Sequence, residues 1–408
     1  MTKRVAIVAG EASGDLLGAA LIHAIRERWP EVEFFGIAGP KMIAEGARTL
    51  YPMERLAVRG YVEVLKHLRE LLHIRAGLAR TLMKEKPDLF IGVDAPDFNI
   101  GTRWMKGLEP RLKAAGIPTV HCVSPSIWAW RAERIRWIAK SVDRMLVIFP
   151  FEEPIYRKAG IPVNFVGHPL ADAMPLDPDR REARAQLRLG SAAVPVALLP
   201  GSRVSELELH TDLLIETARE LLKKRPELHF FVPLATRETR EYFERRIYEL
   251  EARELPITIL FGHARLALHA SEAALVASGT AALEAALARC PMVITYRLSK
   301  LTHWLVKRKL LLPYVGLPNV LAGEFIVPEL LQDDATPANL AQALGNWLDN
   351  KTARDLLRAR FARLHAELAK GHDERIVQAL APYFANPSES HVPPSAFAPD
   401  RLAAVRGR

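Results

Sequence analysis

The chain has 408 residues, which is too long for one typical hydrophobic core, so the length favours two domains. With 49% apolar and 25% charged residues, the composition is that of a globular protein and excludes a disordered chain. The formal net charge of +9 indicates an anionic partner, which by charge alone is a nucleotide, a nucleic acid or a membrane surface.

The cysteine content and the apolar segments narrow the compartment. Cys122 and Cys290 are too few and too far apart for a disulfide framework or a Cys-rich metal site, which favours a reducing cytosol. The first four residues lead directly into an apolar run without a secretory signal region. No apolar stretch approaches the length that spans a bilayer, so we expect any membrane contact to be peripheral.

Short apolar runs alternate with helical patterns along the first half of the chain. The runs predict strands at Val5–Ala9, Glu33–Ile37, Leu89–Val93, Thr119–Val123, Met145–Phe149 and Asn164–Val166. Between them, the apolar periodicity of Leu16–Arg28 and Val62–Met83 predicts helices. This alternation is typical of a parallel sheet covered by helices.

The second half repeats the plan. Its apolar runs predict strands at Val196–Leu199, His229–Val232, Ile257–Leu260, Ala273–Ala277 and Met292–Thr295. Helical patterns follow at Pro337–Asp349, Thr352–Lys370 and Glu374–Phe384, and residues 386–408, which are rich in proline, are predicted to be disordered. We therefore predict an α/β protein with two Rossmann-like, doubly wound domains in tandem.

Acidic residues follow two strands of the first half, where parallel sheets place their chemistry. Glu11 and Asp15 lie in the loop AGEASGD, whose glycine spacing fits neither a dinucleotide fingerprint nor a Walker loop. The alternative is a capped turn with Ser13 or Asp15 at the helix N-terminus. In GVDAPDFN, we assign Asp94 to chemistry, as a possible general base toward a hydroxyl, and Asp97 to helix capping.

Two further loops of the first half are unusual. VSPSIWAWR contains Trp128 and Trp130, which are costly to expose, so we favour packing at a domain seam over direct stacking on a substrate. In FVGHP, His168 is a candidate acid or base, although a histidine before proline is more often a structural, hydrogen-bonded residue.

The stretch VALLPGSRVSELE opens the second half and has the features of an anion site. An apolar run ends at a Pro-Gly turn formed with Gly201 and Ser202, and a helix follows, for which Ser205 and Glu208 predict a capping box. Orphan backbone N–H groups at such a turn attract anions, and the Arg203 guanidinium can grip phosphate oxygens. An ordinary turn with a solvated arginine is equally consistent with these residues.

A second small-residue turn, ASGTAALEA, follows the run Ala273–Ala277. The N–H groups around Ser278, Gly279 and Thr280 are expected to form another phosphate site, and Glu284 lies one helical turn after Thr280. Two phosphate-suited turns and one carboxylate indicate a nucleoside diphosphate. The small residues alone also suit close packing of a helix on a sheet, but that explanation leaves Glu284 unused.

Several motifs occur together in one order. They are AGEASGD, GVDAPDFN, VSPSIWAWR, FPFEEPIYRKAGIPV, FVGHPLAD, LLPGSR, ASGTAALEAAL and PNVLAG followed by IVPELLQ. From about Val5 to Phe384 the chain thereby resembles the lipid-A-disaccharide synthases. ASGTAALEA is moderately specific for that family, whereas AGEASGD with SPSIWAWR and GLPNVLAG is highly specific.

The resemblance implies a glycosyltransferase-B fold. It implies an acceptor and membrane-side domain at residues 1–171, a UDP-sugar domain at 172–364, and helices at about 365–385 that return to the first domain. It also implies an inverting hexosyltransferase that condenses UDP-2,3-diacylglucosamine with 2,3-diacylglucosamine 1-phosphate (lipid X). The products are a β-1′,6-linked disaccharide 1-phosphate and UDP.

The same resemblance implies roles for individual residues. Asp94 and Glu11 are the acceptor-side carboxylates, with Asp94 favoured as the general base, and Arg203 with the Ser278–Thr280 backbone stabilises the departing diphosphate. Glu284 holds the ribose, and Asn319 of GLPNVLAG lines the donor site. No metal or other cofactor is implied, and inversion by direct displacement needs one base and no covalent nucleophile.

The family also implies a cytoplasmic protein at the inner-membrane surface, with lipid substrates, no nucleic acid and a possible homodimer. An apolar stripe along Val58–Met83 suits acyl chains or membrane docking, although core packing explains it equally well. The stripe consists of Val62, Leu65, Leu68, Leu72, Ala76 and Ala79, with Lys66, Arg69, Arg75 and Arg80 largely off it. A basic-apolar run at His303–Pro313 suits anionic lipid or a second subunit.

One position departs from the family pattern. Arg59 precedes Gly60, where the family usually has Met-Gly before Glu-Val-Leu, and this affects the expected acyl-group detail rather than the reaction.

Two other functions remain open at this stage. A UDP-sugar 2-epimerase shares the fold and the nucleotide turns, but it requires no acceptor and gives no use to the amphipathic stretch or the paired tryptophans. A basic protein that binds membranes or nucleic acid without catalysis explains the net charge, but it leaves Glu11, Asp94 and Glu284 idle.

Overall fold

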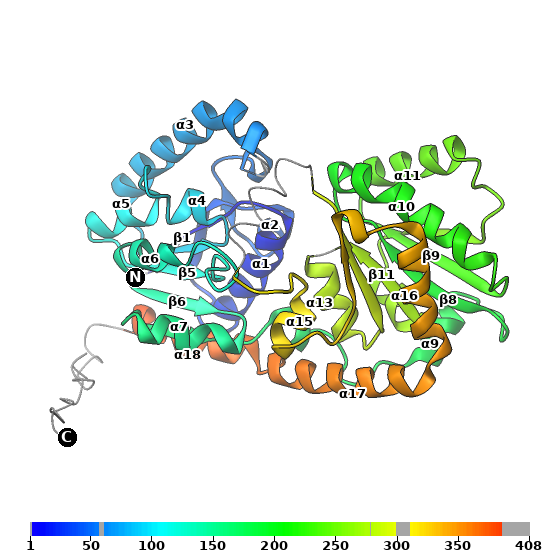
Figure 1. The fold of residues 1–408 in the computed structure, drawn as a ribbon. Coiled ribbons are helices and arrows are strands. Elements are labelled where there is room, and N and C mark those ends of the chain that lie inside the picture. The colour runs from blue at the N-terminus through cyan, green and yellow to red at the C-terminus, as the bar shows by residue number, and fades with distance from the viewer. Residues whose placement is uncertain (1, 57–60, 278, 299–310, 386–408) are drawn as a thin grey trace, which may run out of the picture.

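The computed structural model describes residues 2–56, 61–277, 279–298 and 311–385. Within these residues the chain forms two parallel sheets flanked by helices, one in each half of the sequence (Figure 1). The predicted fold class is confirmed. Arg59, Ser278, most of His303–Pro313 and the predicted disordered tail lie outside the described residues.

The first sheet has seven strands in the order β3-β2-β1-β4-β5-β6-β7. The strands are β1 (Arg4–Ala9), β2 (Glu33–Ile37), β3 (Arg48–Thr49), β4 (Leu89–Val93), β5 (Thr119–Cys122), β6 (Arg144–Val147) and β7 (Val163–Phe165). Every pairing is parallel. The order reverses direction between β1 and β4, which makes that pair the topological switch point of the sheet.

The second sheet has six strands in the order β10-β9-β8-β11-β12-β13. The strands are β8 (Val194–Leu199), β9 (Leu228–Leu234), β10 (Ile257–Phe261), β11 (Ala273–Ala277), β12 (Met292–Tyr296) and β13 (Glu329–Leu331). These pairings are also parallel, and the order reverses between β8 and β11. β11 is buried along its whole length, which explains its continuous apolar sequence.

Helices connect the strands of both sheets. Those of the first half and the linker are α1 (Ala12–Arg28), α2 (Pro40–Ala44), α3 (Tyr61–Glu85), α4 (Pro96–Asn99), α5 (Glu109–Ala114), α6 (Ile135–Ser141), α7 (Glu153–Lys158), α8 (Pro169–Asp172) and α9 (Arg180–Gln186). The later ones are α10 (Val204–Leu222), α11 (Arg237–Glu249), α12 (Ala264–Ala270), α13 (Thr280–Leu287), α15 (Leu317–Ala322), α16 (Pro337–Asp349), α17 (Lys351–Leu368) and α18 (His372–Phe384). Short 3₁₀ turns are η1 (Met53–Arg55), η2 (Ala132–Arg134), η3 (Pro150–Glu152) and η4 (Gln332–Asp334).

The last two helices return to the first sheet. α17 runs along the lower side of the molecule, and α18 lies against α1 (Figure 1). The rings of Trp29 and Phe384 stack with centroids 4.3 Å apart. The Asp172 carboxylate accepts hydrogen bonds from the backbone N–H groups of Gly371 and His372, at 3.2 and 2.7 Å. The returning helices expected from the resemblance are therefore present, while the domain boundaries at residues 171 and 364 stay predictions.

His168 holds this return in place. It is 4% exposed, its Nδ1 accepts a hydrogen bond from the N–H of Leu170, and its backbone N–H donates to the carbonyl of Leu368. Burial, together with the nearby His372, lowers its pKa to about 3. These contacts favour the structural role over acid–base chemistry.

In the part of α3 whose side chains are described, the apolar stripe differs in phase from the prediction except at Ala79, and the side chains of Val62 and Leu65 lie outside that part. Ile74, Leu78, Ala79 and Leu82 are buried, whereas Leu68, Leu72 and Ala76 are only half-buried. Arg75, predicted to lie off the stripe, is 4% exposed and donates to the carbonyl of Asp97 at 3.3 Å. Core packing therefore accounts for the C-terminal half of this helix. No described helix is long and apolar enough to cross a membrane.

The buried neutral histidine predicts a pH-dependent stability. The unfolded chain binds a proton at His168 near pH 6.5, whereas the folded chain does so only near pH 3, so stability is lost as the pH falls through this window. Between pH 7 and pH 5 this one group costs the folded state about 2 kcal/mol. His168→Asn keeps a capping acceptor but cannot take up this proton. The decrease in the free energy of unfolding from pH 7 to pH 5, measured by urea unfolding, should therefore be smaller in this variant by that amount. An equal loss in both proteins would contradict the assignment.

Candidate active site

The loops that carry the predicted acceptor-side carboxylates lie together at the switch point of the first sheet. β1 pairs with β4, so the residues after Ala9 and after Val93 leave the sheet side by side. A Cβ placed on Gly10 would lie 2.7 Å from the Cβ of Ala95, so only glycine allows the two loops to approach this closely. The parallel strands thus bring Glu11 and Asp94 to one edge of the sheet.

Glu11 is the N-cap residue of α1 but makes no side-chain capping bond. Its carboxylate accepts from the Ser13 hydroxyl at 2.6 Å and from the Arg203 guanidinium at 3.1 Å, and the side chain is 13% exposed. The alternative of Ser13 or Asp15 as the N-cap is wrong, because α1 already begins at Ala12. Asp15 does not lie at the mouth of the site either: it is 3% exposed and accepts from the backbone N–H groups of Lys41 and Met42.

Asp94 lies in a strained turn at the end of β4. Asp94 and Ala95 both have left-handed backbone conformations, with φ values of 51° and 44°. The backbone carbonyl of Asp94 accepts a hydrogen bond from the side-chain amide of the fully buried Asn99 at 2.9 Å. The backbone N–H of Asp94 donates to the carbonyl of Cys122. The turn is therefore held from both sides, which lets the surrounding structure maintain the strained conformation. The side chain itself is half-buried.

A buried polar cluster lies beneath this turn. The fully buried Glu109 and His121 approach to 2.6 Å, and both are close to Asn99, since a Cβ on Gly92 would contact all three. Burial raises the pKa of Glu109, an effect that His121 opposes. Asn99, which borders this cluster, bonds the Asp94 carbonyl, so the buried cluster supports the turn that carries Asp94.

Asp97 does not cap the helix as predicted. Ala95 is the N-cap residue of α4, and Asp97 lies in its first turn, where its carboxylate pairs with Arg134. The assignment of Asp94 rather than Asp97 to the site agrees with this position, because Asp97 is largely exposed.

The Pro-Gly turn after β8, where an anion site is predicted, lies at the switch point of the second sheet. Gly201 has φ of 124°, a conformation that favours glycine, and the helix begins at Val204 with Arg203 as its N-cap residue. The predicted capping box of Ser205 and Glu208 is wrong, because both lie inside the helix. Instead the Glu206 carboxylate accepts hydrogen bonds from Ser202, from the backbone N–H at 2.7 Å and from the side-chain hydroxyl at 3.3 Å. The same carboxylate lies 3.6 Å from the Arg203 guanidinium.

Arg203 links the two halves of the protein. Its guanidinium lies 3.1 Å from Glu11 of the first half and 3.6 Å from Glu206 of its own helix, and the side chain is 31% exposed. The carboxyl edges of the two sheets therefore face each other at this ion pair. A diphosphate bound to Arg203 would be drawn to the same edge as the acceptor-side carboxylates.

The third group of predicted residues follows β11, next to β8 in the sheet. Gly279 is the N-cap residue of α13, and Thr280 is exposed at the start of that helix. Gly279 has φ of 133°, and a Cβ placed on it would meet no heavy atom within 4 Å, so its surface is open. Ser278 lies outside the described residues.

Glu284 is half-buried on the second turn of α13. Its carboxylate lies 3.4 Å from the Arg265 guanidinium. Burial raises the pKa of Glu284, and Arg265 opposes that shift. Glu284 thus keeps a cationic neighbour while lying one turn from the N-terminus of α13, where phosphate donors are predicted.

Asn319 is buried rather than exposed to the site. Its amide donates to the Val327 carbonyl and the Glu329 carboxylate, and its carbonyl accepts from the N–H groups of Ile326 and Val327. Glu329 in turn accepts from the N–H of Gly316 at 2.9 Å. Asn319 therefore holds the segment around α15, and a direct contact with the donor stays a prediction.

The tryptophan loop is braced by its own domain. Trp128 donates from its indole N–H to the Glu152 carboxylate at 2.9 Å and packs edge-on against Phe151, while the Arg131 guanidinium lies 4.1 Å from the Trp130 ring. Burial raises the pKa of Glu152 to about 7. The carbonyl of Ala129 accepts from the N–H of Leu311, so the loop lies at the seam between the halves, as expected.

Glu206, Glu152 and the pair Glu109–His121 are not among the residues predicted from the sequence. Glu206 had one usable signal: it stands at the third helical position after a Pro-Gly turn, where carboxylates commonly reach back to backbone N–H groups. The other residues become neighbours only through the fold. Among the described residues, no group of three or more His, Cys, Asp and Glu side chains could hold a metal ion.

Comparison with known proteins agrees with the geometry. The family model described as lipid-A-disaccharide synthetase matches residues 5–380. The chain is 56% identical over 383 residues to the lipid-A-disaccharide synthase of Aromatoleum aromaticum, covering 94% of this chain and 96% of that protein. It is 54% identical over 376 residues to that of Methylobacillus flagellatus, covering 92% and 98%.

Solved structures support the fold. The UDP-GlcNAc 2-epimerase of Neisseria meningitidis, solved with UDP-GlcNAc, superimposes with a TM-score of 0.59 at 13% identity, over 94% of this chain and 100% of that one. MurG of Acinetobacter baumannii gives 0.55 at 17% identity, over 93% and 99%. At these identities the likeness shows a shared two-sheet architecture.

Proposed function

Because the chain belongs to the lipid-A-disaccharide synthase family, and is therefore a glycosyltransferase of lipid A biosynthesis, we propose that the Glu11–Arg203 edge is where its two substrates react. The observation that carries this proposal is the ion pair itself. It brings the loop after β1, next to that after β4, into contact with the turn after β8, next to that after β11, and we assign the first pair to the acceptor and the second to the diphosphate.

The proposed reaction joins UDP-2,3-diacylglucosamine to lipid X. The 6-hydroxyl oxygen of the acceptor attacks the anomeric carbon of the donor while the bond from that carbon to the diphosphate oxygen breaks. Asp94 takes the hydroxyl proton, and UDP carries away the electron pair of the broken bond. One displacement inverts the anomeric carbon and gives the β-1′,6 linkage.

Arg203 and two turns stabilise the leaving UDP in this proposal. The guanidinium and the N–H groups of Gly201 and Ser202 would donate to the phosphate oxygens, the Ser202 N–H in exchange for its bond to Glu206. The N-terminus of α13 would supply further N–H donors around Gly279 and Thr280. Glu284 is placed to accept hydrogen bonds from the ribose. These donors supply the positive charge for the diphosphate, and an undiminished rate in EDTA would test the expectation that no metal is required.

Glu11 has a second role in this arrangement. It holds Arg203 at 3.1 Å, so a diphosphate competes with Glu11 for the same guanidinium. Donor binding thereby changes the charge beside Asp94. Whether Glu11 or Asp94 accepts the proton is distinguished by the pH profiles of their amide variants.

Asp94→Asn and Arg203→Ala should each lower turnover by about 100-fold or more, the scale of a lost general base or charge stabiliser. The measurement is UDP release from UDP-2,3-diacylglucosamine with lipid X in detergent. Asp97→Asn is the matched control for Asp94, because Asp97 lies in the same loop but is largely exposed and pairs with Arg134. Near-wild-type turnover in either folded variant would remove that residue from the mechanism.

Substitution of Glu206 should improve ligand binding, in contrast to the losses expected for Asp94 and Arg203. Its carboxylate accepts from the Ser202 N–H, which is one of the proposed phosphate donors. Glu206→Gln removes a negative charge next to the diphosphate, so UDP should bind about threefold to fivefold more tightly. Isothermal titration with UDP measures this change, and weaker binding would show that Glu206 supports the turn more than it competes with the ligand.

An exposed aromatic loop supports peripheral membrane association. Trp104 is 84% exposed, the Arg103 guanidinium lies 5.1 Å from its ring, and Lys106 is exposed two residues later. The loop directly follows the Asp94 turn and α4, so it would place the acceptor-side loops at the surface from which lipid X is taken. Aromatic rings with flanking cations suit an anionic lipid interface. The cytoplasmic, inner-membrane location and the homodimer stay predictions.

Trp104→Ala should weaken binding to phosphatidylglycerol-containing vesicles by about tenfold, the cost of exposing one large side chain that inserts. Tyr248→Ala is the control. Tyr248 lies on α11 in the second half, is 62% exposed, and has the Arg253 guanidinium 4.3 Å from its ring, so it is a similar exposed aromatic residue away from the proposed lipid contact. Vesicle co-sedimentation measures both. Equal binding by the two variants would exclude this loop as the lipid contact.

An epimerase would share the fold, but it differs from a synthase because it needs no acceptor. A synthase releases UDP only when lipid X is present and forms a disaccharide. If no disaccharide forms with any lipid acceptor, while UDP-GlcNAc is epimerised, the assignment of the reaction fails.

A further inference from the structure

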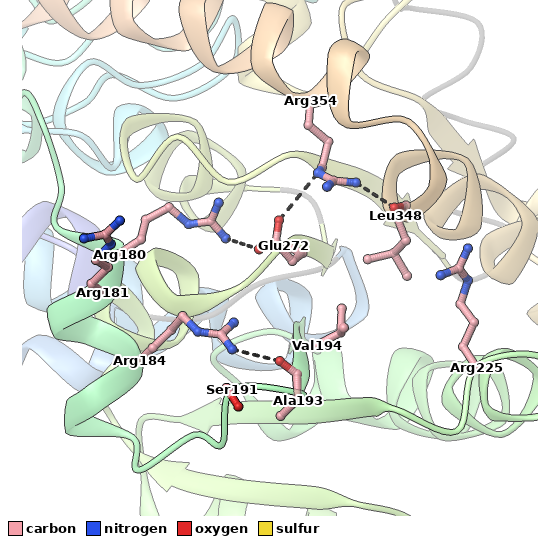
Figure 2. Close-up of a pocket in the computed structure, with 10 residues that line it drawn as sticks. All are labelled: Arg180, Arg181, Arg184, Ser191, Ala193, Val194, Arg225, Glu272, Leu348 and Arg354. Atoms are coloured by element: carbon pink, nitrogen blue, oxygen red, sulfur yellow. Dashed lines mark hydrogen bonds and ion pairs between the residues drawn. The ribbon is translucent and has the colours of Figure 1, made fainter.

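A cavity of about 630 Å³ lies in the second half, apart from the site described above (Figure 2). The arginines Arg180, Arg181 and Arg184 of α9 line one side, Arg225 and Arg354 line another, and Glu272 lies between them. Its volume falls in the usual range for small-molecule sites.

The cavity is at the opposite end of the sheet from the candidate active site. Val194, which lines it, is the first residue of β8, and Glu272 immediately precedes β11. Arg203 and Gly279 follow the carboxyl ends of these same two strands. A ligand in the cavity therefore cannot be the reacting diphosphate.

The cavity carries an excess of positive charge. Among the described residues that line it are five arginines and a single carboxylate, that of Glu272. Arg225 is partly neutralised from outside the lining, because it pairs with Asp349 and lies 3.7 Å from Glu227. Arg180 lies 2.9 Å from Glu272, and Arg354 and Arg358 lie at 3.5 and 3.2 Å. Burial tends to raise the pKa of Glu272, but these three arginines outweigh it and the pKa is lowered. One charged carboxylate is thus shared by three guanidinium groups.

Three of the arginines, Arg180, Arg184 and Arg354, are held in fixed positions rather than extended into solvent. Arg184 donates to the carbonyl of Ala193 at 2.9 Å, Arg354 to that of Leu348 at 2.7 Å, and Arg180 to that of Ser271 at 2.8 Å. In Figure 2 the guanidinium groups of Arg180 and Arg354 point toward Glu272 from two sides. Each of these hydrogen bonds to a carbonyl orders a guanidinium group without neutralising its charge. A ligand would therefore lose little affinity to the ordering of these side chains.

From this arrangement we propose that the cavity binds a small soluble anion with two or more phosphate charges. Planar guanidinium groups donate pairs of parallel hydrogen bonds that match phosphate oxygens, and several fixed groups around one space favour a multiply charged ligand over a single carboxylate. The site is independent of the glycosyl transfer and of its donor.

The test uses inorganic pyrophosphate, titrated calorimetrically into the full chain in EDTA. The Arg203→Ala background removes the diphosphate contact of the active site, so the remaining binding reports on the cavity. Adding Arg184→Gln should weaken that binding about tenfold or more, and adding Arg181→Gln, whose side chain is exposed, should weaken it less. Arg188→Gln is the matched control, because Arg188 follows α9 but does not line the cavity.

A variant of the carboxylate guards against a purely structural effect of losing Arg184. Glu272→Gln removes the competing negative charge, so pyrophosphate should bind more tightly and should raise the Tm of this variant more than that of its parent. No binding in the Arg203→Ala background overturns the proposal, as does equal binding by the Arg184→Gln and Arg188→Gln proteins. Loss of anionic-vesicle binding in Arg184→Gln without any pyrophosphate binding also overturns it, in favour of a lipid headgroup.

Discussion

Parallel pairing of the strands is the constraint on which the rest of this structure depends. It sends every strand of a sheet out at the same edge, and the reversal of strand order opens one gap in each sheet, between β1 and β4 and between β8 and β11. The loops at those two gaps carry Glu11, Asp94, Arg203 and Gly279. Residues almost two hundred positions apart, such as Glu11 and Arg203, therefore meet without any special local sequence.

Much of this could be predicted because the strands are buried on both faces. Continuous apolar runs mark such strands, and the predicted bounds of β2, β4 and β11 coincide with those observed. β3 and β13 were missed because they are short edge strands, of two and three residues, without an apolar run. The observed helix starts differ from the predicted ones because Glu11 and Arg203 make no side-chain capping bond, so neither N-cap residue marks the boundary. At α10 the one side-chain signal is Glu206, at the third helical position.

The site was predictable in its loops but not in its contacts. Strand-end carboxylates and small-residue turns can be recognised from order and spacing. The burial of Asp15 against α2, the enclosure of Asn319 and the contact of Glu109 with His121 depend on packing between distant segments, which spacing does not encode. The polar groups that hold a candidate site residue are thus harder to predict from a sequence than the loop that carries it.

The return of α18 to α1 has a consequence for synthesis on the ribosome. The first sheet and α1 leave the exit tunnel long before Phe384, which stacks on Trp29, has been translated. During that interval the apolar face of α1 that α18 later covers stays open to water and to other nascent chains. The packing of the first sheet and its helices is therefore completed only after the second sheet has been translated, and during this interval a chaperone that covers the exposed face of α1 would protect the chain most.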